Sequence, residues 1–336
     1  MLRDLYSRTN LIKERSKKMK KELKFVFAAL TLLTGLTACN SNDDGVTEGI
    51  EIPGITITND AECCSAEEAL QVYKFLQTLK IVPELSIEVD GKYNVFAYTK
   101  TGGLHNGYNE LYFVATKKSS GNYVKDFDIT AITPLMNMVK MGMEHSTPVG
   151  GNAVSFDETR LAVKRTWISA VMNTSENGTW SLSYVARVLN SGARLDRAEI
   201  VVNALPDGQA WLKSFKVGDA TYYLTLVDPT SWKTGSNEIQ AYVSKKSSVI
   251  TTPYALATEK FTIEIDPRMP DMGNHGSPNN IALTLQDDGS YKGSINITMT
   301  GLWRIHLTVK NEQGDVVAGG DDLSDGLSSL FWDVTL

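Results

Sequence analysis

Two stretches of the sequence place methionine and histidine close together. The first contains Met138, Met141, Met143 and His145, and the second contains Met269, Met272 and His275. Each stretch includes glycine and ends in proline, so we expect two surface loops, where a methionine gains little from burial. A further methionine and then a tryptophan follow each loop, Met172 with Trp180 and Met299 with Trp303. These side chains suit the binding of a metal better than the filling of a core.

The donor atoms indicate which metal would bind. A thioether sulfur is a soft, neutral ligand, and together with an imidazole it favours Cu(I) over hard cations. Thioethers also resist oxidation better than thiolates in an oxidising compartment. In the second loop, Met269, Met272 and His275 would form a three-coordinate site, with Met299 on an adjacent strand as a fourth sulfur. In the first loop Met136 is an additional candidate, so the choice of sulfurs stays open there.

A structural interpretation of the same residues also stays open, in which the methionines cover one end of a β-sandwich and each histidine caps a turn. Recurrence favours the metal, because both loops lie in segments that repeat. Asn109-Glu110 returns as Asn237-Glu238 at an offset of 128 residues, and residues 116–120 return closely as 244–248. The two loop histidines are 130 residues apart. This repeat predicts two related domains, residues 85–190 and 191–336.

Secondary structure must supply the frame for these loops. Ser65 followed by Glu68 is typical of a helix start, and apolar residues at helical spacing continue to Pro83, so residues 61–84 are predicted to form an amphipathic helix. After it come short β-rich runs, separated by Gly, Asn, Asp and Ser at intervals typical of sandwiches. The expected fold is mainly β, with two tandem immunoglobulin-like β-sandwich domains preceded by a short amphipathic helix.

The N-terminal segment predicts export. A basic stretch precedes an apolar run of about eleven residues, 25–35, which suits the core of a signal peptide and is too short for a membrane-spanning helix. Residues 1–38 are therefore predicted to be a signal peptide, with Met19 as a fitting start. Residues 36–39 resemble the lipobox of bacterial lipoproteins, so we expect Cys39 to be lipidated and 39–60 to be a tether. Asp43-Asp44 resembles the surface-export signal of Bacteroidetes lipoproteins. The alternative is ordinary secretory cleavage with Cys39 free.

Composition excludes some classes of protein. After residue 38 the chain has 24 basic and 36 acidic residues, a formal charge of −12, which is the wrong sign for a nucleic-acid binder. The sequence shows neither a nucleophile elbow nor a metalloprotease helix, and it has no phosphate loop or dinucleotide fingerprint. The repeated Glu110 and Glu238 fall in separate domains, so a paired-carboxylate glycosidase is not expected. We therefore expect a protein that is not an enzyme.

The second copy resembles a known family. Residues 269–278, followed by Tyr291-Lys292-Gly293 and by residues 299–303, are similar to the YtkA-like or FixH-type domains. These domains are small immunoglobulin-like sandwiches associated with copper handling outside the cytoplasm. The resemblance covers residues 261–310 and is weaker over 130–185, where the gap from methionine to tryptophan is longer. It implies that Met269, Met272, His275 and Met299 are ligands, and that the partner is an outer-membrane transporter, a copper chaperone or an oxidase-assembly factor.

These observations predict an extracytoplasmic lipoprotein that captures, buffers or transfers Cu(I). A lipid would anchor it to the outer membrane, at the cell surface or on the periplasmic face. The alternative is an interaction module whose tandem sandwiches bind a glycan or a protein, and an exposed aromatic cluster at a loop tip would favour that alternative.

The remaining cysteines and histidines give weaker signals. Cys63-Cys64 could be two small apolar residues, a copper-capturing thiol pair or a strained vicinal disulfide. His306 is expected on the same strand face as Arg304, at the solvent or across from a neighbouring strand. His105 is expected to be a polar residue of a surface loop.

Overall fold

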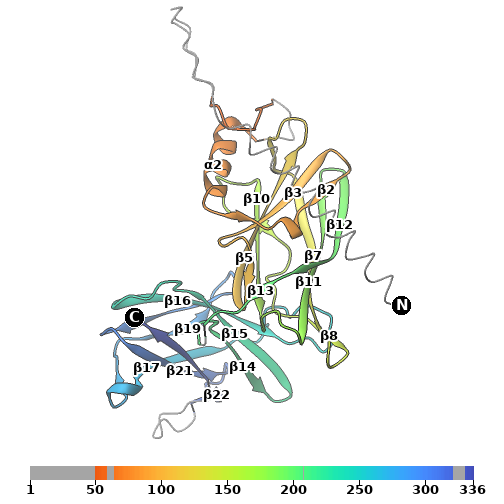
Figure 1. The fold of residues 1–336 in the computed structure, drawn as a ribbon. Helices are drawn as coiled ribbons and strands as arrows, with labels where there is room; N and C mark the ends of the chain where they lie inside the picture. Colours follow the sequence, from red (N-terminus) through yellow and green to blue (C-terminus); the bar gives the residue numbers. More distant parts are fainter. Residues whose placement is uncertain (1–49, 59–63, 207, 321–329) are drawn as a thin grey trace, which may run out of the picture. The chain divides into compact units, whose positions relative to one another are not determined.

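The computed structural model describes residues 50–58, 64–206, 208–320 and 330–336 (Figure 1). The predicted signal peptide, the lipidated Cys39 and Cys63 lie outside these residues. The chain divides into two compact units, Met1–Gly49 and Ile50–Leu336, and the second contains everything described below. In that described part, no helix is both long and apolar enough to cross a membrane.

One short α-helix precedes the strands. Helix α2 spans Ala66–Leu76, and the side chain of Ser65 caps it by accepting from the backbone N–H of Glu68 at 3.3 Å, as the sequence predicts. Its buried face is Ala69, Val72 and Leu76, which pack with outward-facing residues of the first sheet. The predicted helix over 61–84 is too long, because 3-10 helix η1 (Pro83–Leu85) and a strand at Lys80–Ile81 follow α2.

The first sandwich has two main sheets. Seven strands form one of them: β1 (Lys80–Ile81), β2 (Ile87–Val89), β3 (Tyr93–Thr99), β5 (Gly107–Lys117), β6 (Tyr123–Val124), β9 (Val154–Ser155) and β10 (Val163–Ala170). The other has the order β12 (Ser191–Ile200), β11 (Gly178–Val188), β7 (Phe127–Met138) and β8 (Met143–His145). A parallel pair joins β4 (Leu104–His105) to β13 (Val202–Asn203). Every other ladder in this sandwich is antiparallel.

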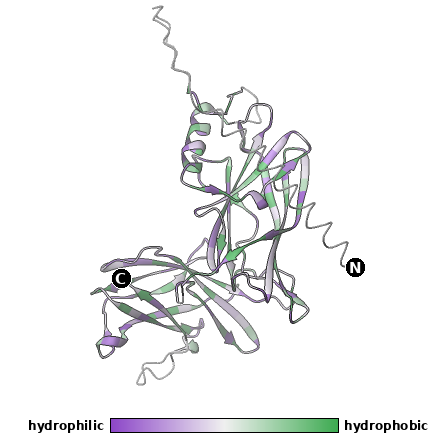
Figure 2. Ribbon diagram, viewed as in Figure 1, coloured by the Kyte–Doolittle hydropathy of each residue, from purple (hydrophilic) through white to green (hydrophobic). Residues whose placement is uncertain are grey.

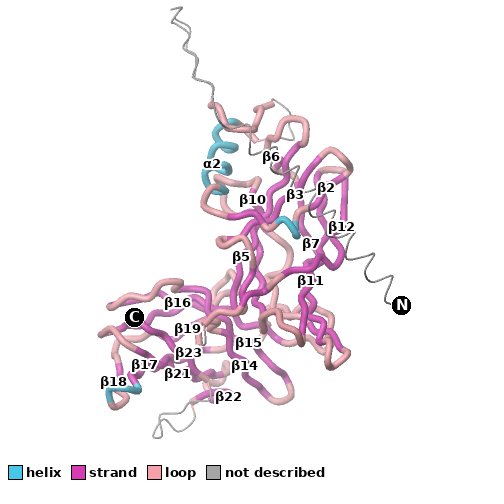
Figure 3. Tube along the Cα trace, viewed as in Figure 1, coloured by secondary structure: helices cyan, strands magenta, loops and turns pink. Residues whose placement is uncertain are grey.

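The second sandwich is one continuous ladder. Its order is β14 (Leu212–Val217), β15 (Ala220–Asp228), β16 (Gly235–Lys245), β20 (Tyr291–Ile297), β19 (Ile281–Leu285), β17 (Thr262–Met269), β21 (Leu302–Lys310) and β22 (Val316–Gly319). Strand β18 (His275–Gly276) pairs with β17, and β23 (Phe331–Thr335) pairs with β21. The 3-10 turn η2 (Pro270–Met272) joins β17 to β18 and is visible in Figure 3. Strand β19 pairs with β20 on one side and with β17 on the other.

Hydrophobic and hydrophilic residues alternate along many of the strands (Figure 2), and buried hydrophobic residues form one core cluster in each sandwich. In the first sandwich Phe113, Trp180 and Tyr184 are buried between the sheets, and in the second Trp303 and Trp332 are. Replacing such an aromatic residue by alanine costs about 3–5 kcal/mol of stability. The expectation of a mainly β fold built of sandwiches is confirmed.

The two sandwiches share the order of strand pairing around β5 and β16. They also share the shape of the loop that leads into each of these strands, which is here called the corner. Strand β5 pairs with β3 and β10, and β16 pairs with β15 and β20, and the bounds of β5 and β16 differ by 128 residues at both ends. Asn109 donates to the carbonyls of residues 105 and 107 at 2.7 and 2.9 Å and accepts from the N–H of residue 105. Asn237 makes the same three bonds to residues 233 and 235. The repeated asparagine is thus a structural element.

Two predicted boundaries are wrong. The expected division at residues 190 and 191 falls in the tight turn of a hairpin, because β12 pairs with β11 from Val188↔Ser191 to Trp180↔Ile200. The first sandwich therefore continues to Asn203 in β13. The expected tether over 39–60 is also too long, because Ile52 is buried and the N–H of Thr56 donates to the Ser120 carbonyl at 2.7 Å. Polarity alone did not show that this segment packs on the sandwich.

We expect Asn109→Ala and Asn237→Ala each to lower the free energy of unfolding by about 1–3 kcal/mol, because each leaves loop backbone groups without partners. Urea unfolding of the purified protein measures the change. The exposed Asn190 provides a control, and Asn190→Ala should stay within about 0.5 kcal/mol of the parent. Equal effects of all three substitutions would show that the repeated asparagines do not hold the corners.

Candidate metal site

The first Met/His loop is the β7–β8 hairpin. Its register pairs Met136 with His145 and Met138 with Met143. Residues directly opposite each other in an antiparallel ladder project to the same face, and residues two apart on one strand do so as well. Three methionines and one histidine therefore share one face of this hairpin.

Two thioether sulfurs of that face converge on the same point. A Cβ added to Gly178, on the neighbouring strand β11, would lie 3.4 Å from the sulfurs of both Met136 and Met138. The two sulfurs are therefore within about 7 Å of each other. Gly178 leaves the space that the Met136 methyl occupies, and Met136 is 2% exposed.

His145 is oriented as a nitrogen ligand would be. Its Nδ1 lies 3.0 Å from the Ser146 carbonyl, which can only accept, so Nδ1 is the donor and Nε2 is the ring nitrogen left to bind a metal. Histidines that bind metals commonly donate their other ring N–H to a backbone carbonyl in this way. The imidazole meets the Trp180 ring edge to face, with centroids 5.9 Å apart.

The other face of the hairpin carries the charge. Glu144 accepts from the Arg197 guanidinium at 2.5 and 3.0 Å. That hydrogen-bonded cation lowers the pKa of Glu144 below its ordinary value. In the β7–β8 ladder Glu144 stands opposite Asn137, not opposite a methionine. The ion pair of Glu144 with Arg197 therefore lies on the face away from the thioethers.

The second loop also places a methionine directly opposite a histidine. Met269 at the end of β17 is directly opposite His275 in β18. Met269 is 3% exposed, and its methyl lies 2.9 Å from the place of a Cβ on Gly301. Gly301 comes two residues before Trp303, as Gly178 comes two residues before Trp180. By register and packing, Met269 therefore corresponds to Met136, a correspondence that the sequence left open.

Each tryptophan is tied to the methionine that precedes it. Trp180 donates its indole N–H to the Met172 carbonyl at 3.0 Å, and Trp303 donates to the Met299 carbonyl at the same distance. These bonds hold each methionine at the edge of a buried indole. Met299 is partly buried against the second core, whereas Met172 is 37% exposed.

The structure does not bring every predicted ligand onto these faces. Met141 is in the turn of the β7–β8 hairpin and is 65% exposed, and Met272 is in η2 and is 54% exposed. These two are matching loop-tip residues. Neither stands opposite a histidine in the strand register.

The remaining predicted residues lie elsewhere. Cys64 is buried, and its N–H donates to the Tyr123 carbonyl at 3.0 Å. His306 is two residues after Arg304 on β21, so the two side chains lie on the same face, as expected. It stands opposite Asp266 and is 3% exposed, whereas a solvent-facing position was one of the expectations. Burial lowers the pKa of His306. His105 lies in β4 and is only partly exposed, and it lines a cavity.

Within the described ranges, no three or more His, Cys, Asp or Glu side chains are grouped as they would be to hold a metal ion. The two faces described above rely instead on methionine sulfur.

Comparisons with known proteins give no family for this chain. No family model matches it, and no curated protein matches it. Among solved structures, the InvE adhesin of Yersinia pseudotuberculosis is 12% identical with a TM-score of 0.19, and 70% of this chain aligns to 55% of that one. Dimeric latent PorU of Porphyromonas gingivalis is 12% identical with a TM-score of 0.20, and 77% of this chain aligns to 24% of it. The chain thus spans about half of the adhesin and a quarter of PorU.

Proposed function

We propose that this protein is an extracytoplasmic lipoprotein that binds Cu(I) at one Met/His face in each sandwich, for capture, buffering or transfer. The observation that carries the proposal is the β7–β8 hairpin, where Met136, Met138, Met143 and His145 share a face. Soft thioether sulfur donors beside an imidazole nitrogen suit Cu(I) better than hard cations. The acidic chain would modestly attract cations, and the sulfurs would supply selectivity.

The second face supports the same chemistry with fewer donors. It offers Met269 and His275 from one strand pair. The further sulfur would come from Met299, which lies in the bend before β21 rather than on an adjacent strand. Met272 is on a short exposed turn beside this pair, and methionine is flexible enough to reach inward. We expect one Cu(I) per sandwich, bound more tightly at the first face because it presents more thioethers.

The alternative without a metal was tied to an exposed aromatic cluster at a loop tip. Among the described residues, the exposed large apolar side chains are valine, leucine, isoleucine and methionine only. That particular sign of an interaction module is therefore not seen in this part of the chain.

Location and partner belong to the same proposal. Lipidation at Cys39 would hold the sandwiches at the outer membrane, and a copper chaperone or outer-membrane transporter would give or receive the ion. This role needs no catalysis.

We expect His145 and His275 each to be required for the binding of one Cu(I) ion. We expect the parent to bind two Cu(I) equivalents in competition with bicinchoninate under anaerobic, reducing conditions. His145→Ala and His275→Ala should each remove one equivalent, or weaken it at least about tenfold, and the double variant should lose both. Retention of both ions by the double variant would overturn the proposal.

Within the first hairpin, methionines can be compared with a matched control. Met136→Leu combined with Met138→Leu removes two sulfurs at nearly constant side-chain volume. The free energy of unfolding should therefore change by less than about 1.5 kcal/mol, while the affinity for Cu(I) falls. Met141→Leu removes a sulfur from the same hairpin at its exposed tip and should leave affinity unchanged. Equal losses from both would show that the shared face is not the site.

Gly178 allows the sulfurs to be displaced without being removed. A Cβ there overlaps the Met136 methyl, so Gly178→Ala should shift this flexible side chain and weaken Cu(I) binding at the first face. In Gly192→Ala, in β12 of the same sheet, the new Cβ meets its neighbours only at ordinary distances of 3.7 and 3.8 Å. That variant should bind as the parent does. Unchanged binding by Gly178→Ala would count against Met136 as a ligand.

Cys39→Ser should release the protein from membranes, because it removes the residue that carries the lipid. Membrane fractionation and the mass of the mature N-terminus measure this, with Cys63→Ser as the control that stays anchored. A Cys39→Ser protein that remains in the membrane fraction would refute the lipid anchor.

A further inference from the structure

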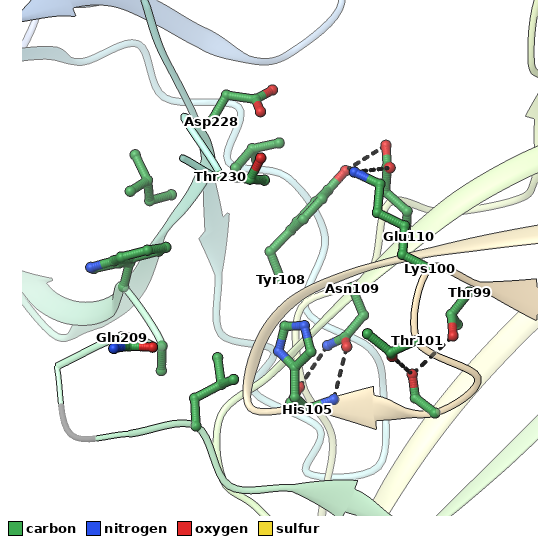
Figure 4. Close-up of a pocket in the computed structure, with 16 residues that line it drawn as sticks. Thr99, Lys100, Thr101, His105, Tyr108, Asn109, Glu110, Gln209, Asp228 and Thr230 are labelled. Atoms are coloured by element: carbon green, nitrogen blue, oxygen red, sulfur yellow. Dashed lines mark hydrogen bonds and ion pairs between the residues drawn. The ribbon is translucent and has the colours of Figure 1, made fainter. Parts of the chain in front are cut away.

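A cavity of about 320 Å³ lies away from both Met/His faces (Figure 4). One wall is formed by residues of the β3–β4 turn, β4 and the start of β5. The other is formed by Leu205, residues 209–211, residues 226–228 and Thr230. Its volume is at the low end of the range of small-molecule sites, which is about 300–1,000 Å³.

The walls are held together by specific contacts. Asn106 accepts from the N–H of Leu205 at 2.7 Å, and the Trp211 indole donates to the Asp333 carbonyl at 2.9 Å. Gly107 has φ +86°, and a Cβ there would overlap the Ala210 carbonyl oxygen. The close approach of these two backbone segments therefore requires glycine, and the cavity is part of the folded structure rather than a gap between loose loops.

The carboxylate of Glu110 lies at one side of the cavity with its charge already offset. It accepts from the Tyr112 hydroxyl at 2.7 Å and from the Tyr108 hydroxyl at 3.4 Å, and Arg165 and Lys100 lie 3.5 and 3.8 Å away. Burial, with a smaller contribution from Glu110, raises the pKa of Tyr108, so the phenol stays protonated. Figure 4 shows Tyr108 and Lys100 directed to this carboxylate.

Other polar groups of the lining remain available to a ligand. His105 has its Nδ1 2.9 Å from the Asn106 carbonyl, so Nδ1 donates there and Nε2 is the ring nitrogen left for a ligand. The exposed Asp228 carboxylate has no hydrogen-bond or ion-pair partner among the described residues, and Thr230 and Gln209 add a hydroxyl and an amide. Both donors and acceptors are therefore present.

The combination of charged, polar and aromatic groups in the lining indicates which class of ligand would bind. Asp228 would repel an anion, and an organic cation would meet the Lys100 ammonium. A purely apolar ligand would leave these groups without partners, which costs free energy. A sugar ring suits the lining, because its hydroxyls both donate and accept and its C–H face can lie on an aromatic ring such as that of Trp211 or Tyr108.

We propose that this cavity binds one unit of a neutral saccharide. The proposal does not depend on copper, because none of the residues of the two Met/His faces lines the cavity. The corner that Asn109 holds in the first sandwich would then help to bind a ligand as well as stabilise the fold. A neutral peptide offers similar donors and acceptors, but it lacks the flat C–H face that aromatic walls recognise.

Saturation-transfer NMR of the purified full-length protein in detergent tests the proposal. The probes are neutral sugars at millimolar concentration: a hexose, an N-acetylhexosamine, a 6-deoxyhexose, a pentose and their disaccharides. Glucuronate, glucosamine and trialanine serve as anionic, cationic and peptide comparators. We expect saturation transfer to at least one neutral sugar and not to the comparators.

Two substitutions place the binding. Asp228→Asn alters an exposed group and should leave the fold intact while weakening the sugar at least fivefold, and Trp211→Ala should abolish binding. Asp219→Asn, at an exposed turn outside the cavity, is the control and should bind as the parent does. Absence of transfer to every neutral sugar, transfer to a comparator instead, or sugar binding that Asp228→Asn leaves unchanged would overturn the proposal.

Discussion

The antiparallel pairing of a methionine with a histidine is the constraint on which both candidate copper faces depend. Met136 stands opposite His145, and Met269 stands opposite His275. A shift of register by one residue would turn the partner side chain to the other face of the sheet and separate sulfur from nitrogen. The faces therefore exist only while the register holds.

Packing beside a tryptophan positions the methionine of each pair. In each sandwich a glycine two residues before the tryptophan makes room for the methionine methyl, and the indole N–H holds a carbonyl of the preceding segment. Met136 and Met269 are almost fully buried, so they belong to the cores as well as to the candidate faces. The structural and the metal interpretations of these methionines are thus compatible: core packing would preorganise sulfurs whose neighbours remain accessible.

Much of this arrangement could be predicted from the sequence. The β-rich runs, the Ser65 cap and the repeat of Asn109 as Asn237 follow from local chemistry and spacing, and the repeat appears in the structure as the same set of hydrogen bonds. The equivalence of the two histidines follows in the same way. These features are local, so the sequence carries them directly.

Other features depend on contacts between distant segments. The hairpin of β11 and β12 crosses the expected boundary, and its two-residue turn at Leu189-Asn190 gives no local signal that the chain returns to the same sandwich. Met136 is one of four candidate sulfurs in its segment, and only the ladder shows that it stands opposite His145. His105 reads as a surface residue, yet the parallel pairing of β4 with β13 brings it to a cavity wall. Register and long-range pairing supply what composition cannot.

Copper K-edge X-ray absorption on the protein loaded with Cu(I) tests the central claim most directly, because it reports the ligand atoms themselves. With two equivalents bound, we expect sulfur scatterers at about 2.3 Å together with a nitrogen scatterer that shows the outer-shell pattern of imidazole. Loading one equivalent should give the spectrum with the larger sulfur contribution, from the face that contains Met136 and Met138. A spectrum with only oxygen and nitrogen neighbours would contradict the account.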